Sequence, residues 1–286
     1  MMPQVQAADT LLEWRESAKY WNKHSATIHS MFAPLTRALI EDAGIKTGDL
    51  VLDVAGGAGE PSLTIARLVG PTGSVMCTDA IEEMVNAAEE EAHERGIENT
   101  AFRQCVADSL PFPNDSFDAV VSRLGAMFFP DPLDALREML RVTKPAGTLT
   151  FAVWHKSELN PYSYVVTRVL SRYVEIPAAD PAAPDAFRFA ELGKLAAILR
   201  EVGVTSVTER VLKFEMEAAI SFEEFWTMRS EVSELLREKL RSLTEAQSLR
   251  VAQEVQDDAR QFFSSNGMSL PAEAIMVSGR KPKNPH

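Results

Sequence analysis

The sequence predicts an α/β fold in which helices cover both faces of a doubly wound, largely parallel sheet. Short apolar runs alternate along the chain with longer stretches of helical period, and several of the runs end in an acidic residue. Alternation at these lengths is typical of βαβ units, which place consecutive strands parallel. Seven strands are expected, near residues 50–54, 74–79, 101–106, 117–121 and 148–154, within 204–217, and at 274–280.

The most informative segment runs from Leu50 to Pro61, with the sequence Leu-Val-Leu-Asp-Val-Ala-Gly-Gly-Ala-Gly-Glu-Pro. Its apolar start predicts a buried strand, its small residues predict a tight turn, and Pro61 is expected to begin a helix. In doubly wound sheets, this junction of strand and helix is where nucleotide-like ligands bind.

Two acidic residues, Asp53 and Glu60, flank this turn and discriminate between cofactors. A dinucleotide site has a third glycine where this chain has Ser62, and Glu60 would repel the pyrophosphate. No Gly-Lys-Ser/Thr follows the turn, which excludes a P-loop. S-adenosylmethionine has no phosphate and carries a sulfonium cation, which suits acidic surroundings. A turn without any ligand is the alternative at this point.

Acidic residues also follow the next two predicted segments, so that Asp53, Asp79 and Asp108 come after three consecutive strands. The carboxyl ends of parallel strands form one edge of a sheet, and ligands bind at that edge. Asp79 lies about 20 residues after the glycine turn, the spacing at which a carboxylate meets ribose hydroxyls. Asp79 fits equally as the cap of a helix that starts near Ile81.

Residues 50–154 resemble the class I S-adenosylmethionine-dependent methyltransferases. The first motif, Leu52 to Glu60, is similar to that of the ubiquinone/menaquinone-biosynthesis C-methyltransferases in the type 11 methyltransferase group, which also tolerate its alanine. Two later segments, 110–118 and 141–147, match further family signatures, although Ala146 stands where glycine is usual. The resemblance implies a Rossmann-like, seven-stranded doubly wound sheet whose last strand is antiparallel.

The resemblance also implies a cofactor site. The glycine turn would surround the methionine part, Asp79 would accept hydrogen bonds from both ribose hydroxyls, and Asp108 would bind the adenine amino group. Met84 would pack on the adenine, with core packing as its alternative, and Arg123 would lie below the methionine carboxylate, with a surface ion pair as its alternative. The expected cofactor residues are Asp53, Ala55, Gly56, Gly57, Gly59, Asp79, Ala80, Met84, Ala107, Asp108, Ser109, Ser122 and Arg123.

A helical cap is expected over this core, formed by N-terminal helices and by insertions. The expected division is an N-terminal cap at 1–34, the cofactor-binding core at 35–155, an insertion at 156–188, and completion of the core at 189–286 with a cap insertion at 221–268.

Local signals place several helix ends. Pro34 is expected to separate two N-terminal helices, and Asp131 to cap a helix that begins at Pro132. Two helices are expected at 221–241 and 244–263, each opened by a capping box, with Asn266-Gly267 ending the second.

Composition restricts the class of protein. The 286 residues carry a net charge of −12, and no stripe of Lys and Arg is present, so nucleic acid is not an expected partner. No apolar run is long enough for a membrane span and no secretory leader is seen, so a cytoplasmic protein without stable membrane insertion is expected. Cys77 and Cys105 lie in predicted strands, and the histidines lack metal-ligand spacing, so no metal is expected. The sequence does not indicate an oligomeric state.

The predicted activity is methyl transfer from S-adenosylmethionine, with S-adenosylhomocysteine as product, to an O, N or C nucleophile of an apolar or aromatic small molecule. The alternative is C-methylation in a quinone pathway; a non-catalytic cofactor-binding module and a nicotinamide oxidoreductase are less favoured. The residues expected to contact the acceptor are Tyr20, Trp21, Phe128, Trp154 and Trp226. His155 and His24 are the candidate general bases, each with a structural hydrogen bond as its alternative.

Overall fold

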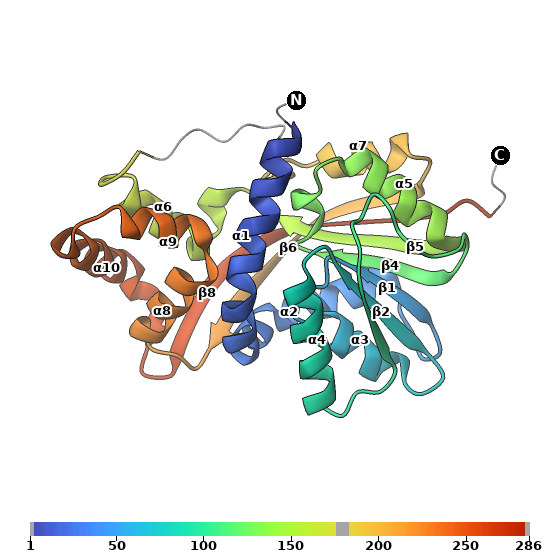
Figure 1. Cartoon of the computed structure of the whole chain (residues 1–286), viewed down its shortest axis with the longest axis horizontal. Helices are drawn as coiled ribbons and strands as arrows, with labels where there is room; N and C mark the ends of the chain where they lie inside the picture. The colour runs from blue at the N-terminus through green and yellow to red at the C-terminus, as the bar shows by residue number, and fades with distance from the viewer. Residues whose placement is uncertain (1–2, 176–182, 284–286) are drawn as a thin grey trace.

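The structure is a computed structural model that describes residues 3–175 and 183–283, with side chains from Leu11 onward except that of residue 13. Part of the insertion expected at 156–188 therefore lies outside the described residues. Two groups of helices flank one long sheet, and the first helix runs between them (Figure 1).

The sheet confirms the predicted α/β class. Its strands follow the order β3-β2-β1-β4-β5-β8-β6, with β7 paired to β8 at one end. Strand β8 is antiparallel to both of its long neighbours, whereas the other pairs on the path are parallel. The strands are β1 Leu50–Val54, β2 Ser74–Asp79, β3 Thr100–Gln104, β4 Phe117–Arg123, β5 Thr143–Trp154, β6 Thr205–Ala218, β7 Phe263–Ser264 and β8 Gly267–Arg280.

The strand order reverses between β1 and β4, which are hydrogen-bonded neighbours although two strands separate them in sequence. At such a switch point the chain leaves adjacent strands toward opposite faces of the sheet, and a crevice opens at their carboxyl ends. The glycine turn follows β1 directly, so the topology places this turn at the crevice.

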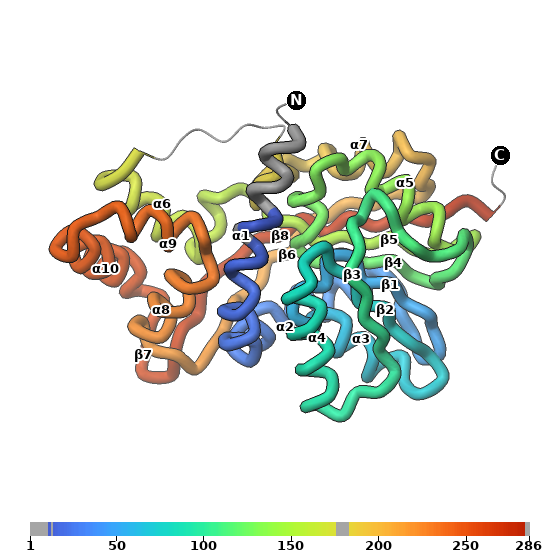
Figure 2. Tube along the Cα trace, viewed as in Figure 1, coloured from blue at the N-terminus to red at the C-terminus, as the bar shows by residue number. Residues whose placement is uncertain are grey.

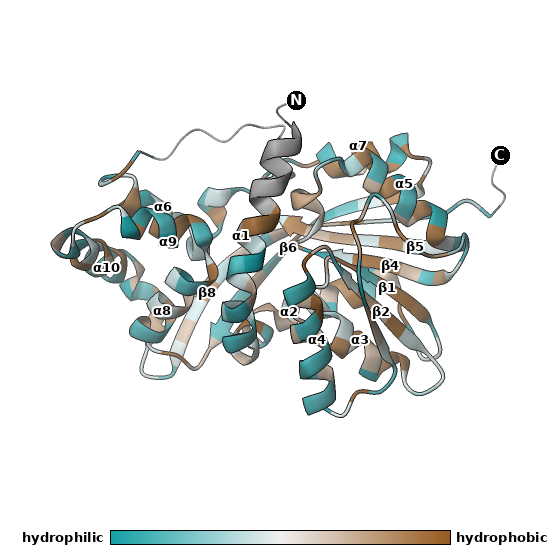
Figure 3. Cartoon of the chain, viewed as in Figure 1, coloured by the Kyte–Doolittle hydropathy of each residue, from teal (hydrophilic) through white to brown (hydrophobic). Residues whose placement is uncertain are grey.

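Helices cover both faces of the sheet (Figure 1). Helices α2, α3 and α4 pack on one face, and α5 and α7 on the other. Their bounds are α2 Ser25–Ala43, α3 Ser62–Val69, α4 Glu82–Glu94, α5 Pro132–Val142 and α7 Lys194–Glu201. Because both faces are covered, the central strands are apolar (Figure 3), and residues 51–54 of β1 are all buried.

A second group of helices forms the cap, at the left of Figure 1. It contains α6 Pro161–Leu170, α8 Phe222–Val232, α9 Glu234–Arg241 and α10 Glu245–Ala259. Helix α1, Pro3–Lys23, packs against α4 on the core side and against α8 and α9 on the cap side. The trace in Figure 2 shows α1 crossing in front of the sheet between the two groups.

The expectation that Pro34 separates two helices is wrong. Helix α2 continues through Pro34, and the break between α1 and α2 falls ten residues earlier, at His24. Proline removes one backbone hydrogen bond from a helix interior. The α2 face that carries Met31, Leu35 and Leu39 is completely buried against the sheet, and this burial outweighs the lost bond.

The region after β6 differs from expectation in two places. Three helices replace the expected two, because the chain breaks at Ser233, whose hydroxyl accepts from the Leu236 N–H and caps α9. Helix α10 ends at Ala259, short of Asn266-Gly267. Residues 265–266 form the turn of the β7–β8 hairpin, and Gly267, at φ +115°, is the first residue of β8. The two predicted capping boxes, which start at Ser221 and Thr244, are confirmed.

Candidate active site

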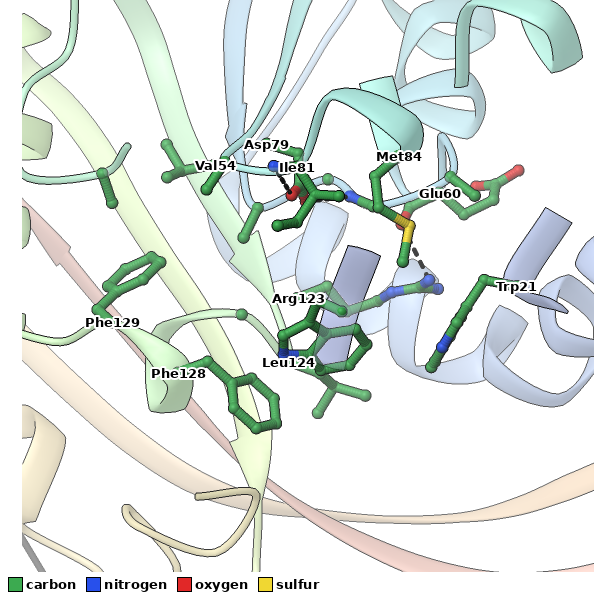
Figure 4. Close-up of a pocket in the computed structure, with 18 of the residues that line it drawn as sticks. Trp21, Val54, Glu60, Asp79, Ile81, Met84, Arg123, Leu124, Phe128 and Phe129 are labelled. Carbon is green, nitrogen blue, oxygen red and sulfur yellow. Dashed lines mark hydrogen bonds between the residues drawn. The ribbon is translucent and has the colours of Figure 1, made fainter. Parts of the chain in front are cut away.

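A cavity of about 220 Å³ opens at the carboxyl ends of β1, β2 and β4 (Figure 4). The glycine turn and the first turn of α4 form one wall, and the segment after β4 forms another. Helix α1 contributes Trp14 and Trp21, and α2 contributes a row of side chains that begins at Ser25. The cavity lies where the topology predicts a ligand crevice.

The glycine turn needs its small residues for two different reasons. Gly57 has φ +55° and open space where a side chain would be, and it lines the cavity. Gly56 is required by close packing, because a Cβ there would lie 2.6 Å from Cys77 Sγ. The turn is fixed by Asp79, whose Oδ2 accepts from the Gly57 N–H at 3.0 Å.

Asp79 shapes both the turn and the start of α4. Its Oδ1 accepts from the Ile81 N–H at 3.0 Å. Ile81 is the N-cap of α4 and no side chain caps the helix, so Asp79 fixes the residue that precedes α4 and does not cap it. Burial raises the pKa of Asp79 and the hydrogen bonds from Ile81 and Gly57 oppose that shift. Each carboxylate oxygen keeps a further lone pair, so both can accept a second hydrogen bond from a ligand in the cavity.

Asp53 lies beneath the turn, and it is not part of the cavity wall. It is fully buried, its Oδ2 accepts from the Ser62 hydroxyl at 2.6 Å, and burial raises its pKa to about 7. Asp79 and Asp108 do line the cavity. Two of the three acids expected at this sheet edge therefore share one cavity.

Arg123 provides the cationic part of the wall (Figure 4). Its guanidinium donates to Thr36 Oγ1 at 2.6 Å and to the Glu60 backbone carbonyl at 2.9 Å, and it lies 5.4 Å from the centre of the Phe32 ring. Burial lowers its pKa, and the negative charges of Glu60 and Asp53 oppose that shift. The alternative of a surface ion pair is wrong, because the half-buried side chain lines the cavity and forms no ion pair with a carboxylate of the described residues.

Glu60 is the centre of a polar network that the sequence did not reveal. Its Oε1 lies 2.9 Å from His29 Nδ1 and 2.7 Å from Arg95 Nη1, and its Oε2 accepts from the Thr64 hydroxyl at 2.7 Å. Burial would raise the pKa of Glu60, but the hydrogen bonds from His29 and Thr64 and the nearby positive charges lower it to about 2. The carboxylate is therefore ionised throughout the ordinary pH range.

His29 was not among the sequence-predicted site residues. Ser25, Ile28, His29 and Phe32 follow the spacing of one helix face, and all four line the cavity. That spacing is the signal that could have found His29, since Glu60 had already been recognised beside the turn.

The cavity also has an aromatic side. Trp14 lies between Trp21 and Phe128, with ring centroids 5.8 and 5.1 Å away, and Phe129 follows on the same segment. Of the expected acceptor residues, Trp21 and Phe128 line the cavity. Tyr20 lies under Arg237, Trp154 packs on Phe32, and Trp226 stacks on Phe222 in the cap.

The two histidines predicted as bases lie elsewhere. His24 Nε2 is 2.6 Å from Glu231 of α8, and His155 Nδ1 is 3.0 Å from Glu273 of β8. Neither is among the cavity-lining residues. The structural hydrogen bond that was the alternative for each is present.

Some of the expected cofactor residues line the cavity and others do not. Those that line the cavity are Ala55, Gly56, Gly57, Asp79, Ala80, Met84, Ala107, Asp108 and Arg123. Those that do not line it are Asp53, Gly59, Ser109 and Ser122. Met84 is buried in a small cluster with Ala18 and Ile81, which confirms its core-packing alternative. It also lines the cavity, and its contact with adenine stays a prediction.

Residues 3–175 and 183–283 contain neither a candidate metal site nor a candidate membrane span. No group of three or more His, Cys, Asp or Glu residues in these ranges is arranged to hold a metal ion. None of the helices in these ranges has the length and apolar character of a membrane span.

Comparison of the sequence with known proteins gives one family. The family model described as the ubiE/COQ5 methyltransferase family matches residues 24–218. The ubiquinone/menaquinone biosynthesis C-methyltransferase UbiE of Cellvibrio japonicus is 37% identical over 150 residues, which are 52% of this chain and 57% of that protein. The UbiE of Pseudomonas fluorescens is 34% identical over 175 residues, covering 60% of this chain and 67% of that protein.

Solved structures share the fold. The YcgJ protein of Bacillus subtilis aligns with a TM-score of 0.56 at 22% identity, covering 88% of this chain and all of that one (100%). A SAM-dependent methyltransferase from Aquifex aeolicus aligns with a TM-score of 0.52 at 25% identity, covering 68% of this chain and 91% of that one. Because the family match covers the core from α2 to β6, this chain belongs to the ubiE/COQ5 methyltransferase family.

Proposed function

We propose that this protein transfers the methyl group of S-adenosylmethionine to a nucleophilic atom of an apolar, aromatic small molecule. The observation that carries the proposal is a single cavity with two unlike sides. One side holds the glycine turn, Asp79 and Arg123, and the other holds Trp14 and Phe128. Apolar pockets with a few placed polar groups are typical of small-molecule sites.

The polar side fits the cofactor. Gly57 leaves room for close approach to its backbone, and both Asp79 oxygens can accept from a ribose diol. Arg123 has five N–H donors, of which two are used, and no carboxylate among the described residues forms an ion pair with it. It can therefore bind the methionine carboxylate, while Met84 packs against the adenine. When bound, the cofactor supplies a methyl group that is electrophilic because it is attached to a sulfonium.

The aromatic side binds and orients the acceptor. Trp14, Trp21 and Phe128 form adjoining apolar faces and exclude water from the cavity. Holding two reactants in line and in contact supplies about 7–11 kcal/mol of barrier lowering in favourable cases. Most of the rate acceleration is therefore assigned to positioning by these side chains.

A second candidate is methylation of a ring carbon in a quinone pathway. It is favoured by the names of the relatives and by the family match, which includes the glycine turn and Arg123. The alignments span 57% and 67% of those relatives. Trp14 and Trp21 precede residue 24, where the family match begins, so the acceptor side is not covered by it. For this reason the broader class of acceptor leads.

The test has a binding arm and a turnover arm. Calorimetry should show binding of S-adenosylmethionine and S-adenosylhomocysteine but not of NADH. Release of S-adenosylhomocysteine should then be measured with alkylphenols, naphthols and an alkyl naphthohydroquinone. Turnover with the phenols supports the broader class, and turnover restricted to the hydroquinone supports the second candidate. NADH binding, or cofactor binding without turnover of any acceptor, would count against methyl transfer.

A further inference from the structure

The network around Glu60 forms part of the cavity wall and has no role in the methyl-transfer site proposed above. Glu60 and His29 both line the cavity, the first from the glycine turn and the second from α2. Only 10% of the Glu60 side chain is exposed, against 39% of the His29 side chain. The pair thus has a buried acidic end and an open imidazole end.

The carboxylate end is rigidly held. Arg95 Nη1 pairs with Glu60 Oε1 at 2.7 Å, and Arg95 Nε pairs with Glu91 Oε1 of α4 at 2.6 Å. The Thr64 hydroxyl of α3 donates to the second oxygen of Glu60 at 2.7 Å. Three elements therefore fix the carboxylate that faces His29, and side chains fixed in this way can orient a neighbouring imidazole.

The ionisation of Glu60 determines which imidazole nitrogen carries the proton. An ionised carboxylate only accepts hydrogen bonds, so His29 Nδ1 donates to Glu60 Oε1 across their 2.9 Å contact. In the neutral imidazole this leaves the lone pair on Nε2. No hydrogen-bond partner for Nε2 is found among the described side chains.

We propose that His29 is the general base of this enzyme and that Glu60 is the residue that positions it. The role rests on the proposed methyl transfer and deepens it. His29 Nε2 takes the proton from an acceptor O–H. The electron pair so released forms the new bond to the methyl carbon, at the oxygen itself or at a conjugated ring carbon, and the pair of the broken carbon–sulfur bond stays on sulfur. When a ring carbon is methylated, its C–H proton is lost to solvent after the new bond has formed, which restores the aromatic ring. The imidazolium that results is stabilised by the Glu60 carboxylate.

His29 is the histidine whose place suits this step. His24 and His155 are paired with Glu231 and Glu273 and do not line the cavity. His29 lines the same cavity as Trp21 and Phe32, and 39% of its side chain is exposed. Proton removal needs the base within hydrogen-bond reach of the acceptor, so the proposal requires the reacting O–H to lie against this part of the wall.

Other charged groups surround His29 and enter any pH dependence. Glu60, Arg95 and Arg123 share its cavity, and Arg37 and Glu41 of its own helix line a hollow on its other side. Arginine stays protonated in the working range, and Glu60 stays ionised because its pKa is about 2. The carboxyl groups of Asp79 and Asp108 also line the cavity, so the pH profile is read as the difference between the native protein and a His29 variant.

The first experiment uses turnover with the acceptor that the native protein methylates fastest. His29→Asn should lower kcat about 10²–10⁴-fold and remove the acidic limb of its pH profile, while the Kd of S-adenosylhomocysteine stays within about threefold. Glu60→Gln should lower kcat in the same direction, and the double variant should be no slower than His29→Asn alone. His29→Ala should regain turnover when imidazole is added. The matched control is His93→Asn, an exposed histidine of α4.

Two outcomes overturn the assignment. An unchanged kcat and pH profile in His29→Asn excludes a base, and a raised Kd with unchanged kcat makes His29 a cofactor-binding residue instead. A second measurement needs no acceptor: ¹⁵N NMR of the imidazole above its titration should show Nδ1 protonated, with this preference lost in Glu60→Gln. A neutral His29 protonated at Nε2 refutes the pair even if methyl transfer is established. A native protein that binds cofactor but methylates nothing refutes the proposed function, while the tautomer still tests the pair.

Discussion

The Ser62 hydroxyl donates a hydrogen bond to Asp53 Oδ2 at 2.6 Å, while Asp53 Oδ1 is buried without a partner among the described residues. This carboxyl lies under the glycine turn, where a Cβ on Gly56 would come within 2.9 Å of it. A buried carboxyl with an unpartnered oxygen is costly to ionise. The turn that faces the cavity is thus supported by a group whose charge changes near neutral pH.

This arrangement predicts a pH-dependent stability. Burial raises the folded-state pKa of Asp53 from 3.8 to about 7, so the folded protein binds this proton more tightly than the unfolded chain. Stability is highest below the unfolded pKa and falls as pH rises toward 7, by about 4 kcal/mol in total. In Asp53→Asn the decline should be smaller than in the native protein by this amount when free energies of unfolding are measured by urea denaturation from pH 4 to 8, and the part that remains includes Asp79, whose pKa burial also raises.

The control for that measurement is Asp134→Asn, because Asp134 is an exposed helix residue whose side chain is 56% accessible. Its slope of stability against pH should match that of the native protein. A slope in Asp53→Asn equal to the native one would mean that Asp53 ionises in the fold without cost.

Alanine substitutions at Gly57 and Gly44 distinguish the cost of backbone strain from the blocking of the ligand site. Both have positive φ, +55° and +64°, and both have open space where a Cβ would stand. Alanine at either position should cost about 1 kcal/mol of stability. Only Gly57→Ala should also weaken S-adenosylhomocysteine binding, since only Gly57 lines the cavity. Thermal unfolding and calorimetry on both variants test this, and equal affinities would place the ligand away from the turn.

Arg123 should contribute strongly to cofactor affinity. It is a half-buried cation with free N–H donors, and a hydrogen bond to a charged group contributes about 1.5–3 kcal/mol. Arg123→Gln should therefore raise the Kd of S-adenosylhomocysteine by about 10–100-fold in calorimetry. Arg137→Gln removes an exposed arginine of α5 and serves as the control. The assignment of Arg123 to the methionine carboxylate is lost if both variants bind alike.

Trp14 should govern the acceptor and leave the cofactor unaffected. It joins Trp21 of α1 to Phe128 through ring contacts on the aromatic side of the cavity. Trp14→Leu should raise KM for an alkylphenol or alkyl naphthohydroquinone several-fold, with the Kd of S-adenosylhomocysteine unchanged. Phe117→Leu, at the opposite end of β4, is the control for losing an aromatic side chain. A change in cofactor Kd with constant KM would reverse the assignment of the two sides.

Much of the core could be predicted because its signals are local. The strand and the turn that follow Leu50 are specified by consecutive residues. The predicted helix cap at Asp131 is also present, because its Oδ1 accepts from the Leu133 and Asp134 N–H groups. The same holds for the capping boxes at Ser221 and Thr244. In each case a side chain satisfies backbone groups within three residues of itself, so no knowledge of distant packing is required.

The failures have a common physical origin in contacts between distant residues. Pro34 lies inside a helix because tertiary burial of that helix compensates for the missing hydrogen bond. His29 and Glu60 are separated by 31 positions, and the local sequence around either residue does not indicate that α2 packs against the glycine turn. Asp53 lies near the carboxyl end of β1, where the sequence predicts an acid facing the ligand. Successive side chains of a strand point to opposite faces, and the Asp53 side chain is buried beneath the turn.

Strand β8 has a consequence for how the molecule comes apart. Its residues 274–280 pair with β5, while its pairing with β6 continues to Met268 beyond the end of β5. The same strand therefore belongs to the α/β half and to the helical half of the protein. From Thr208 to Ala218 the pairing of β6 with β8 keeps one register, and this stretch spans both halves, so neither half has a separate sheet that could unfold first. On heating, the two halves should lose their structure together, as a single cooperative transition.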